Sequence, residues 1–271
     1  DRARQQFYVA GQWGSVFTLD KSGNLLRNQE VFSSVNGYGC AYPHLMVDSS
    51  GVLHFADTTA DAANCIPCSA IRYLTSTDGG ATWRKMDGTA LALPTSPEPD
   101  GPSDMINLPD EVSPYSTWLA NFHVKDGKVH FIYQAASPWD PECLGLTTEL
   151  PNRGHYVRFN AATGVREIDS WAETGSVWSW EVGGIRVGSP WGLLASDVND
   201  PAGPLYAVMQ DSRWQMTSLV SLDNGSTWQF HASSAPRSYN GYAVGGCRTL
   251  TPDGNIIGTF SVGDAQGDWH V

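Results

Sequence analysis

A short sequence pattern that occurs twice is the feature that most constrains this fold. The two copies, at residues 76–83 and 221–228, share Ser, Asp, Gly, Thr and Trp at the same spacing. Each copy follows an apolar run, at 71–75 and at 216–220. A short Asp side chain can accept backbone N–H bonds within a turn, Gly can adopt a positive φ, and Trp can pack its ring on a neighbouring sheet. The pattern therefore predicts a tight turn that closes a β-hairpin.

A second kind of hairpin recurs along the chain. Turn residues that include Gly separate two apolar runs at 45–55, 121–133 and 249–260, and a looser copy spans 193–208. Helix formers are scarce, whereas the 28 Gly and 16 Pro residues cluster with Ser, Thr, Asn and Asp between the apolar runs. Short strands separated by such turn residues are typical of an all-β domain. We therefore expect an all-β fold built from many hairpins.

The two S-x-D-x-G-x-T-W segments resemble the Asp box, or BNR (bacterial neuraminidase) repeat, of sialidase-like β-propellers. That superfamily includes sialidases, other glycoside hydrolases, polysaccharide lyases, lectins and sortilin-like receptors. The resemblance implies four-stranded antiparallel blades around a channel, with an Asp box between the third and fourth strands of a blade. We expect a single propeller domain over residues 1–271 with five blades, four or six being the alternatives. Residues 7–31 and 243–260 are expected to pair and close the ring, and residues 176–189 to hold extra strands.

The charge balance argues against several classes of partner. The chain has 16 Lys and Arg residues against 28 Asp and Glu residues and a formal net charge of -12. Such a surface repels phosphodiester backbones and anionic lipids, so we expect no nucleic acid partner. No apolar run approaches the roughly 20 residues that cross a bilayer, so we expect no membrane insertion. The resemblance implies a carbohydrate ligand or substrate and a secreted or cell-surface location, and we expect a soluble monomer.

The cysteines give a weaker indication. The chain has five, so two disulfides are possible and one thiol is left over; they are Cys40, Cys65, Cys68, Cys143 and Cys247. Two of them form a lone CxxC pair, and a zinc site would need a second pair of ligands at similar spacing, which the sequence does not offer. We favour a disulfide that staples a loop, and we expect no metal and no cofactor.

In sialidase-like propellers, ligands bind at the end of the blades opposite the Asp boxes. The loops assigned to that end lead into the blades at 36–44, 88–118, 171–191 and 237–248, or join second and third strands at 57–70, 135–155 and 210–214. They are rich in carboxylates and in aromatic residues, Trp118 among them. We expect aromatic rings to stack on sugars, and the residues expected to bind substrate in this way are Trp178, Trp191, Trp214 and Tyr242.

Glycosidase-like cleavage is the first candidate function for the end opposite the Asp boxes. It commonly uses two carboxylates that flank the scissile bond. We prefer Asp57 and Glu181 as the pair, because Asp57 is expected to end a strand and Glu181 lies between Trp180 and a Gly-Gly bend, where apolar neighbours would raise its pKa. The alternative is that each carboxylate is a solvated charge on a surface loop and has no part in catalysis.

Polysaccharide lyase activity is a second function, because some propellers cleave uronic-acid polysaccharides by β-elimination. His44 is the preferred base, with Tyr42 beside it, and a hydrogen-bonded structural role is the alternative for that histidine. Arginines that could bind a substrate carboxylate are Arg186, Arg213 and Arg248. The Phe/Tyr-Arg-Ile-Pro motif of sialidases is absent, which argues against sialic acid as the substrate.

A non-catalytic propeller that binds glycans, as a lectin does, or binds proteins is the third function, since fold does not decide function. A lectin predicts several similar, shallow pockets, whereas an enzyme predicts one asymmetric site. The loops differ from one repeat to the next, so the sequence favours an enzyme.

Overall fold

The all-β class is confirmed by a computed structural model, which describes residues 1, 3–33, 38–61, 66–112, 114–137, 146, 150–174, 180–182, 185–187, 192–211, 215–235, 240–263 and 269–270. Within those ranges, the structure describes the backbone but not the side chains of residues 12, 38, 40–41, 61, 66–68, 171–174, 180–182, 185–187, 240–245, 259–263 and 269–270. The described residues form antiparallel sheets joined by turns and short 3-10 helices. None of the helices among them is long and apolar enough to cross a bilayer.

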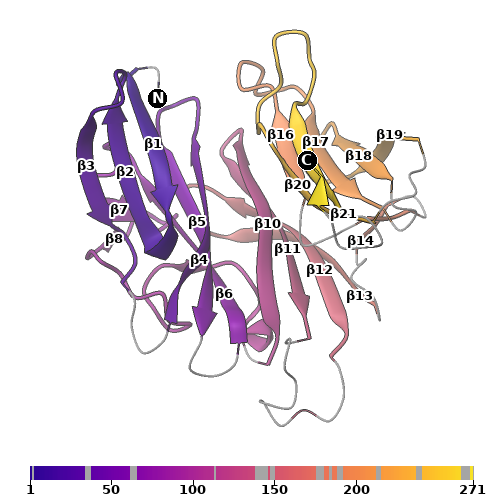
Figure 1. Cartoon of the computed structure of the whole chain (residues 1–271), viewed down its shortest axis with the longest axis horizontal. Coiled ribbons are helices and arrows are strands. Elements are labelled where there is room, and N and C mark those ends of the chain that lie inside the picture. The colour runs from indigo at the N-terminus through magenta and orange to yellow at the C-terminus, as the bar shows by residue number, and fades with distance from the viewer. Residues whose placement is uncertain are drawn as a thin grey trace. The chain divides into compact units, whose positions relative to one another are not determined.

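The first half of the described chain forms two sheets (Figure 1). The first sheet has the order β1-β2-β3 and consists of β1 (Gln6–Gly11), β2 (Ser15–Asp20) and β3 (Leu25–Glu30), with η1 (Gln12–Gly14) between β1 and β2. The second has the order β4-β5-β6-β7-β8, with β9 paired to β6, and consists of β4 (Tyr38–Val47), β5 (Leu53–Asp61), β6 (Ile66–Ser76), β7 (Trp83–Arg84), β8 (Ala90–Leu91) and β9 (Asp104–Met105). The 3-10 helix η3 (Pro109–Glu111) follows β9.

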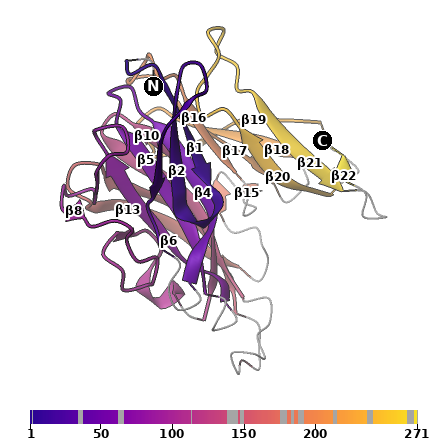
Figure 2. The ribbon, with the colours of Figure 1, turned by 60° about the vertical axis from the view of Figure 1, so that its left-hand side comes forward.

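The second half of the described chain also forms antiparallel sheets (Figure 2). One four-stranded sheet contains β10 (Ser116–Lys125), β11 (Lys128–Ala136), β12 (Asn152–Asn160) and β13 (Arg166–Thr174). The other contains β16 (Leu193–Ser196), β17 (Leu205–Gln210), β18 (Met216–Ser221) and β19 (Gln229–Ser233). Smaller sheets consist of β14 (Trp180–Val182) with β15 (Ile185–Val187), and of β20 (Asn240–Gly246), β21 (Gly258–Gly263) and β22 (Trp269–His270).

The two four-stranded sheets agree with the expected four-stranded antiparallel blades. The extra strands expected within residues 176–189 are present as β14 and β15. Among the described residues, β1-β2-β3 and β20-β21-β22 are separate three-stranded sheets. The five-blade count and the closure of the ring therefore stay predictions.

The chain divides into two compact units, each with its own hydrophobic core. Unit 1 comprises Asp1–Trp118, Ala135–Leu150 and Asn160–Val165, and unit 2 comprises Leu119–Gln134, Pro151–Phe159 and Arg166–Val271. Alternate residues of the strands face these cores, as the pleat requires. The core of unit 1 contains Val16, Val31, Phe32, Leu53, Phe55, Leu74 and Trp83. The core of unit 2 contains Ala120, Ile132, Tyr156, Leu194, Ala207, Met209 and Leu219.

The turn predicted at residues 76–83 is confirmed in unit 1. The Asp78 carboxylate accepts hydrogen bonds from the Thr82 backbone N–H at 2.9 Å and from the Thr82 hydroxyl at 2.7 Å. The Ser76 hydroxyl oxygen accepts the N–H of Gly80 at 2.8 Å, and Gly80 has a φ of +85. Trp83 is 1% exposed and belongs to the core. Each residue type of the pattern thus has a separate part in closing the hairpin.

The turn at residues 221–228 in unit 2 has the same bonds. Asp223 accepts the Thr227 N–H at 2.8 Å and the Thr227 hydroxyl at 2.7 Å. Gly225 has a φ of +84, and a Cβ there would lie 1.6 Å from the Tyr156 hydroxyl oxygen, so both its conformation and its surroundings require glycine. The ring of Trp228 packs edge-on against Tyr156, at 5.1 Å between ring centroids.

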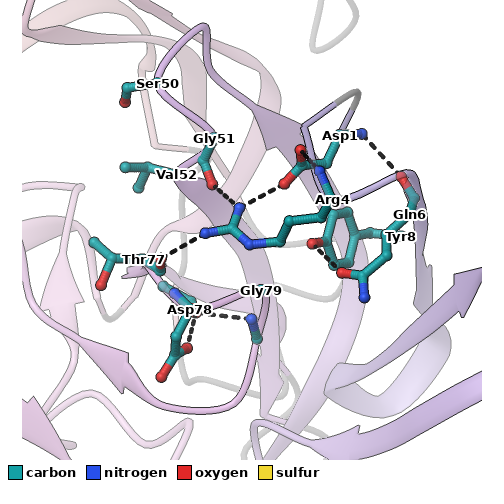
Figure 3. Close-up of polar contacts among 12 residues, drawn as sticks. Asp1, Arg4, Gln6, Tyr8, Ser50, Gly51, Val52, Thr77, Asp78 and Gly79 are labelled. Atoms are coloured by element: carbon teal, nitrogen blue, oxygen red, sulfur yellow. Dashed lines mark hydrogen bonds and ion pairs between the residues drawn. The ribbon is translucent and has the colours of Figure 1, made fainter.

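Arg4 links the turn between β4 and β5 to the turn between β6 and β7 in unit 1. Its guanidinium donates to the carbonyl oxygens of Gly51 and Thr77, each at 2.8 Å, and to the Asp1 carboxylate at 2.5 Å (Figure 3). The planar guanidinium can donate to several oxygens in fixed directions. This end of the sheet is therefore held by bonds among its own groups.

Candidate functional site

The candidate site lies at the other end of the β4–β6 strands, where the sequence placed Tyr42, His44 and Asp57. The strands extend further than the sequence suggested: β4 begins at Tyr38 and β5 continues to Asp61. Asp57 therefore lies within β5, opposite Pro43 and Arg72, and does not end a strand. Thr58 and Thr59 continue the ladder because β-branched side chains suit a pleated sheet.

Asp57 is fully buried, and its carboxylate supports the neighbouring strand. The register of β4 with β5 shifts between Cys40 and Tyr42, which marks a β-bulge. The Asp57 Oδ1 atom accepts the backbone N–H of Tyr42 at 3.0 Å. Asp57 is 0% exposed, so this bond satisfies a carboxylate oxygen that has lost contact with water. The geometry gives Asp57 a part in fixing the backbone that carries Tyr42.

Tyr42 and Trp118 form an accessible aromatic pair at this end. Their ring centroids lie 5.0 Å apart with planes tilted by 38°. Tyr42 is 41% exposed and Trp118 is half-buried. Trp118 lies near the start of β10, so the pair joins two residues that are far apart in the sequence. Amphipathic aromatic rings that remain partly exposed are suited to binding at an interface.

His44 lies on the same face of β4 as Tyr42, because side chains two residues apart on a strand point to the same side. Its cross-strand partner is Ala56, and His44 itself is half-buried. Asp57 pairs with Pro43 and so belongs to the opposite face. The accessible groups on the Tyr42 face are therefore an imidazole, a phenol and an indole.

Arg72, which the sequence did not point to, is a buried residue of β6 that binds the segment before β9. Its guanidinium donates to the main-chain oxygen of Ser103 at 3.0 Å and to that of Glu98. Burial lowers the pKa of Arg72 to about 10, against the opposing charges of Asp100 and Asp104. The only sequence signal was a lone basic residue inside an apolar strand. Arg72 is committed to holding the segment before β9.

The remaining site residues lie in unit 2 or outside the described residues. Glu181 and Arg186 are cross-strand partners in the register of β14 with β15. Tyr242 lies in β20. The guanidinium of Arg248 lies 4.7 Å over the ring of Phe122, and burial lowers the pKa of Arg248 to about 10. The residues outside the described ranges are Trp178, Trp191, Arg213 and Trp214.

The cysteine and possible metal-ligand side chains that the structure describes add no further group to the candidate site. Cys247 is exposed and has a free thiol. The side chains of Cys40 and Cys68, and the whole of Cys65 and Cys143, fall outside the described residues. In the part of the chain that is described, no three His, Cys, Asp or Glu side chains lie close enough to hold a metal ion.

Comparisons with known proteins relate the chain to polysaccharide lyases by fold. No family model matches the sequence, and no curated protein does. Among solved structures, the polysaccharide lyase Uly1 matches with a TM-score of 0.62 and 13% identity, over 97% of this chain and 53% of the lyase. A PL25 ulvan lyase bound to an oligosaccharide of glucuronic acid and sulfated rhamnose matches with a TM-score of 0.58 and 11% identity, over 95% of this chain and 61% of the lyase.

At these identities the matches show a shared fold. The shared fold agrees with the all-β architecture that the sequence pattern predicts. The chain spans 53% and 61% of the lengths of the two lyases.

Proposed function

We propose that this protein is a carbohydrate-active enzyme that cleaves a polysaccharide at the Tyr42 end of the β4–β6 sheet. The observation that carries the proposal is the accessible Tyr42–Trp118 pair beside His44. A sugar ring has an apolar C–H face that can lie against an aromatic ring while its hydroxyls stay in water. Such a contact orients the chain of sugars across the sheet end, and orientation is itself a large part of catalysis.

The chemistry that these residues fit best is β-elimination on a uronic-acid polysaccharide. Neutral His44 takes the proton from the carbon beside the uronate carboxylate, and that electron pair becomes a carbon–carbon double bond. The bond from the adjacent ring carbon to the glycosidic oxygen breaks, and the leaving oxygen takes the proton of the Tyr42 hydroxyl. Asp57 acts as a positioning residue through the Tyr42 backbone N–H. The fold shared with polysaccharide lyases supports this choice.

An arginine would pair with the uronate carboxylate and stabilise the charge that develops there. Arg186 and Arg213 stay candidates for this part. Arg248 is a weaker candidate, because its guanidinium is already packed over Phe122. Trp178, Trp191, Trp214 and Tyr242 stay proposed sugar contacts.

Hydrolysis by Asp57 and Glu181 is the second candidate. Its support is that Asp57, one of the two carboxyl groups that such a reaction needs, is held in place by the Tyr42 backbone N–H. Asp57 lies on the opposite face of the sheet from His44, and this position favours elimination over hydrolysis.

The further parts of the proposal follow the sequence pattern. The turns at 76–83 and 221–228 are Asp boxes of a five-bladed ring closed by its terminal strands. The enzyme acts as a monomer, outside the cell or on its surface, where polysaccharides are found.

The decisive experiment measures products from a panel of polysaccharides with and without uronic acids. Reducing ends that appear together with ultraviolet absorbance of an unsaturated uronic product are expected, and they would be lost in His44→Ala and Tyr42→Phe. Phe7→Ala is the matched control, because Phe7 is an exposed aromatic residue on β1. Reducing ends without absorbance would favour hydrolysis, and glycan binding without any product would contradict an enzyme.

A further inference from the structure

A pocket of about 370 Å³ lies in unit 2, on the face of the β16–β19 sheet that points away from the core. Leu194, Ala207 and Leu219 of these strands pack into the core. Their sequence neighbours alternate to the opposite face, where they line the pocket together with residues 254–258. The volume falls at the lower end of the range of about 300–1,000 Å³ that small-molecule sites occupy.

Strand register builds the floor of this pocket. Leu193 pairs with Val208, and Val208 pairs with Ser218, so the three form one row across the sheet. Because directly paired residues share a face, the row presents two aliphatic side chains and one hydroxyl. Met216, two residues before Ser218 on the same strand, extends the apolar part of the floor.

A β-bulge brings His231 to the wall of the pocket. Ser218 pairs with Ala232 and Leu219 pairs with Phe230, which leaves His231 as the extra residue of β19. A bulge re-aims the side chain of the inserted residue. The His231 ring lies 5.4 Å from the ring of Tyr206, tilted by 42°, and both residues line the pocket. The two rings form an angled aromatic wall.

The pocket offers an amide and a hydroxyl as hydrogen-bonding groups. Asn255 donates its side-chain N–H to Asp253 at 2.7 Å, which fixes the amide and leaves its oxygen as an acceptor. The hydroxyl of Ser218 makes a long bond of 3.4 Å to the Ala232 oxygen. No Lys, Arg, Asp or Glu is among the described residues that line the pocket. An anionic ligand would therefore lose water without gaining a countercharge.

We infer that this pocket binds a neutral sugar of one or two rings, at a site separate from the proposed cleavage site. The C–H face of the sugar lies on Val208 and Met216 and against the Tyr206–His231 wall. Its hydroxyls reach the Ser218 hydroxyl and the Asn255 amide oxygen. All of these residues belong to unit 2, so the inference stands independently of whether Tyr42 and His44 catalyse cleavage.

The test is a titration of the purified protein with D-glucose, D-galactose and L-rhamnose, followed by saturation-transfer NMR. D-glucuronate is the matched anionic probe for D-glucose. We expect at least one neutral sugar to bind, and glucuronate to bind about tenfold more weakly than glucose if glucose is the ligand. Absence of binding by all three neutral sugars would overturn the inference, as would equal binding of glucuronate.

Variants place the binding in this pocket. His231→Ala and Tyr206→Ala are expected to lower the affinity by roughly tenfold, the size of a lost aromatic contact. His231 is exposed, so its replacement leaves the core intact. Phe230→Ala is the matched control, because Phe230 precedes His231 on β19, is 46% exposed and does not line the pocket. An equal loss in this control would contradict the assignment.

Two further measurements separate this inference from its rivals. His44→Ala is expected to leave neutral-sugar binding unchanged, so a failure of the cleavage proposal and a failure of the pocket proposal are distinguishable. Indole serves as a planar apolar probe. Binding of indole that is abolished by His231→Ala, with no binding of any sugar, would overturn the sugar assignment.

Discussion

The two ends of the β4–β6 strands place acidic groups in opposite settings. At the turn end, Asp48 and Asp78 accept bonds from backbone N–H groups of their own turns. Burial opposes their ionisation, but the hydrogen bonds outweigh it and lower the pKa of each carboxyl to about 2. At the other end, Asp57 is fully buried and reaches across to the Tyr42 backbone, beside accessible aromatic rings. One end fastens hairpins, and the other carries the proposed site.

Residue type alone therefore does not identify a site in this fold. Asp48 and Asp78, in the turns, each accept a backbone N–H of their own turn, whereas Asp57, within β5, accepts the N–H of a neighbouring strand. What distinguishes the proposed site is accessibility: Tyr42 is 41% exposed, and His44 and Trp118 are half-buried. A ligand can reach those rings without disturbing any turn.

The largest expected effect is on catalysis at the Tyr42 end. We expect His44→Ala to reduce polysaccharide cleavage by about 100-fold or more, because it removes the general base. The midpoint of thermal unfolding should stay unchanged, since His44 is opposite a small residue and only half-buried. Initial rates and thermal unfolding of the same preparation check this. Unaltered cleavage would remove His44 from the mechanism.

The next effect concerns binding by the aromatic pair. Trp118→Ala is expected to weaken polysaccharide binding by roughly tenfold, because one ring of the aromatic pair is lost. Trp118→Phe should restore most of the affinity. Binding is measured by affinity electrophoresis or calorimetry, with Phe7→Ala as the control. Equal binding by Trp118→Ala and the control would move the ligand away from this surface.

A smaller effect, on stability alone, is expected at the turn end. Asp78→Ala removes the acceptor of the Thr82 bonds and should lower the free energy of unfolding by about 1–2 kcal/mol. Asp223→Ala is the matched change in unit 2. Chemical denaturation gives the values. Cleavage by the folded Asp78→Ala protein should equal that of the wild type, and a loss of catalysis without a loss of stability would break the comparison.

The smallest effect is the dependence of stability on pH. The folded pKa of Asp48, Asp78 and Asp223 is about 2, below the value of about 3.9 in an unfolded chain. Their contribution to stability is thus complete above pH 4 and is lost as the pH falls toward 2. Unfolding free energies measured across this window should decrease with falling pH, and Asp78→Asn should reduce the slope. An unchanged slope in that variant would contradict the assigned pKa.

The turns and hairpins were predictable because their determinants are local. The Asp78 and Asp223 turns depend on residues within a few positions of each other, so the pattern alone gave their hydrogen bonds. Strand ends were less predictable. Residues 57–61 looked like the beginning of a loop, but pairing with β4 and β6 extends the strand through them.

The candidate site was predictable only in part, because it depends on contacts between distant segments. Tyr42, His44 and Asp57 were identified from one strand pair. The sequence could not show that Trp118 packs on Tyr42, or that a bulge aims the Asp57 carboxylate at the Tyr42 N–H. Arg72 was missed because nothing local says that its guanidinium reaches the oxygens of Ser103 and Glu98.

The most direct test of the division between the two ends is the initial rate of polysaccharide cleavage by His44→Ala and Asp78→Ala, measured beside the unfolding free energy of each. We expect His44→Ala to lose cleavage at unchanged stability, and Asp78→Ala to lose stability at unchanged cleavage. The reverse pattern, or the loss of both properties in both variants, would contradict this expectation.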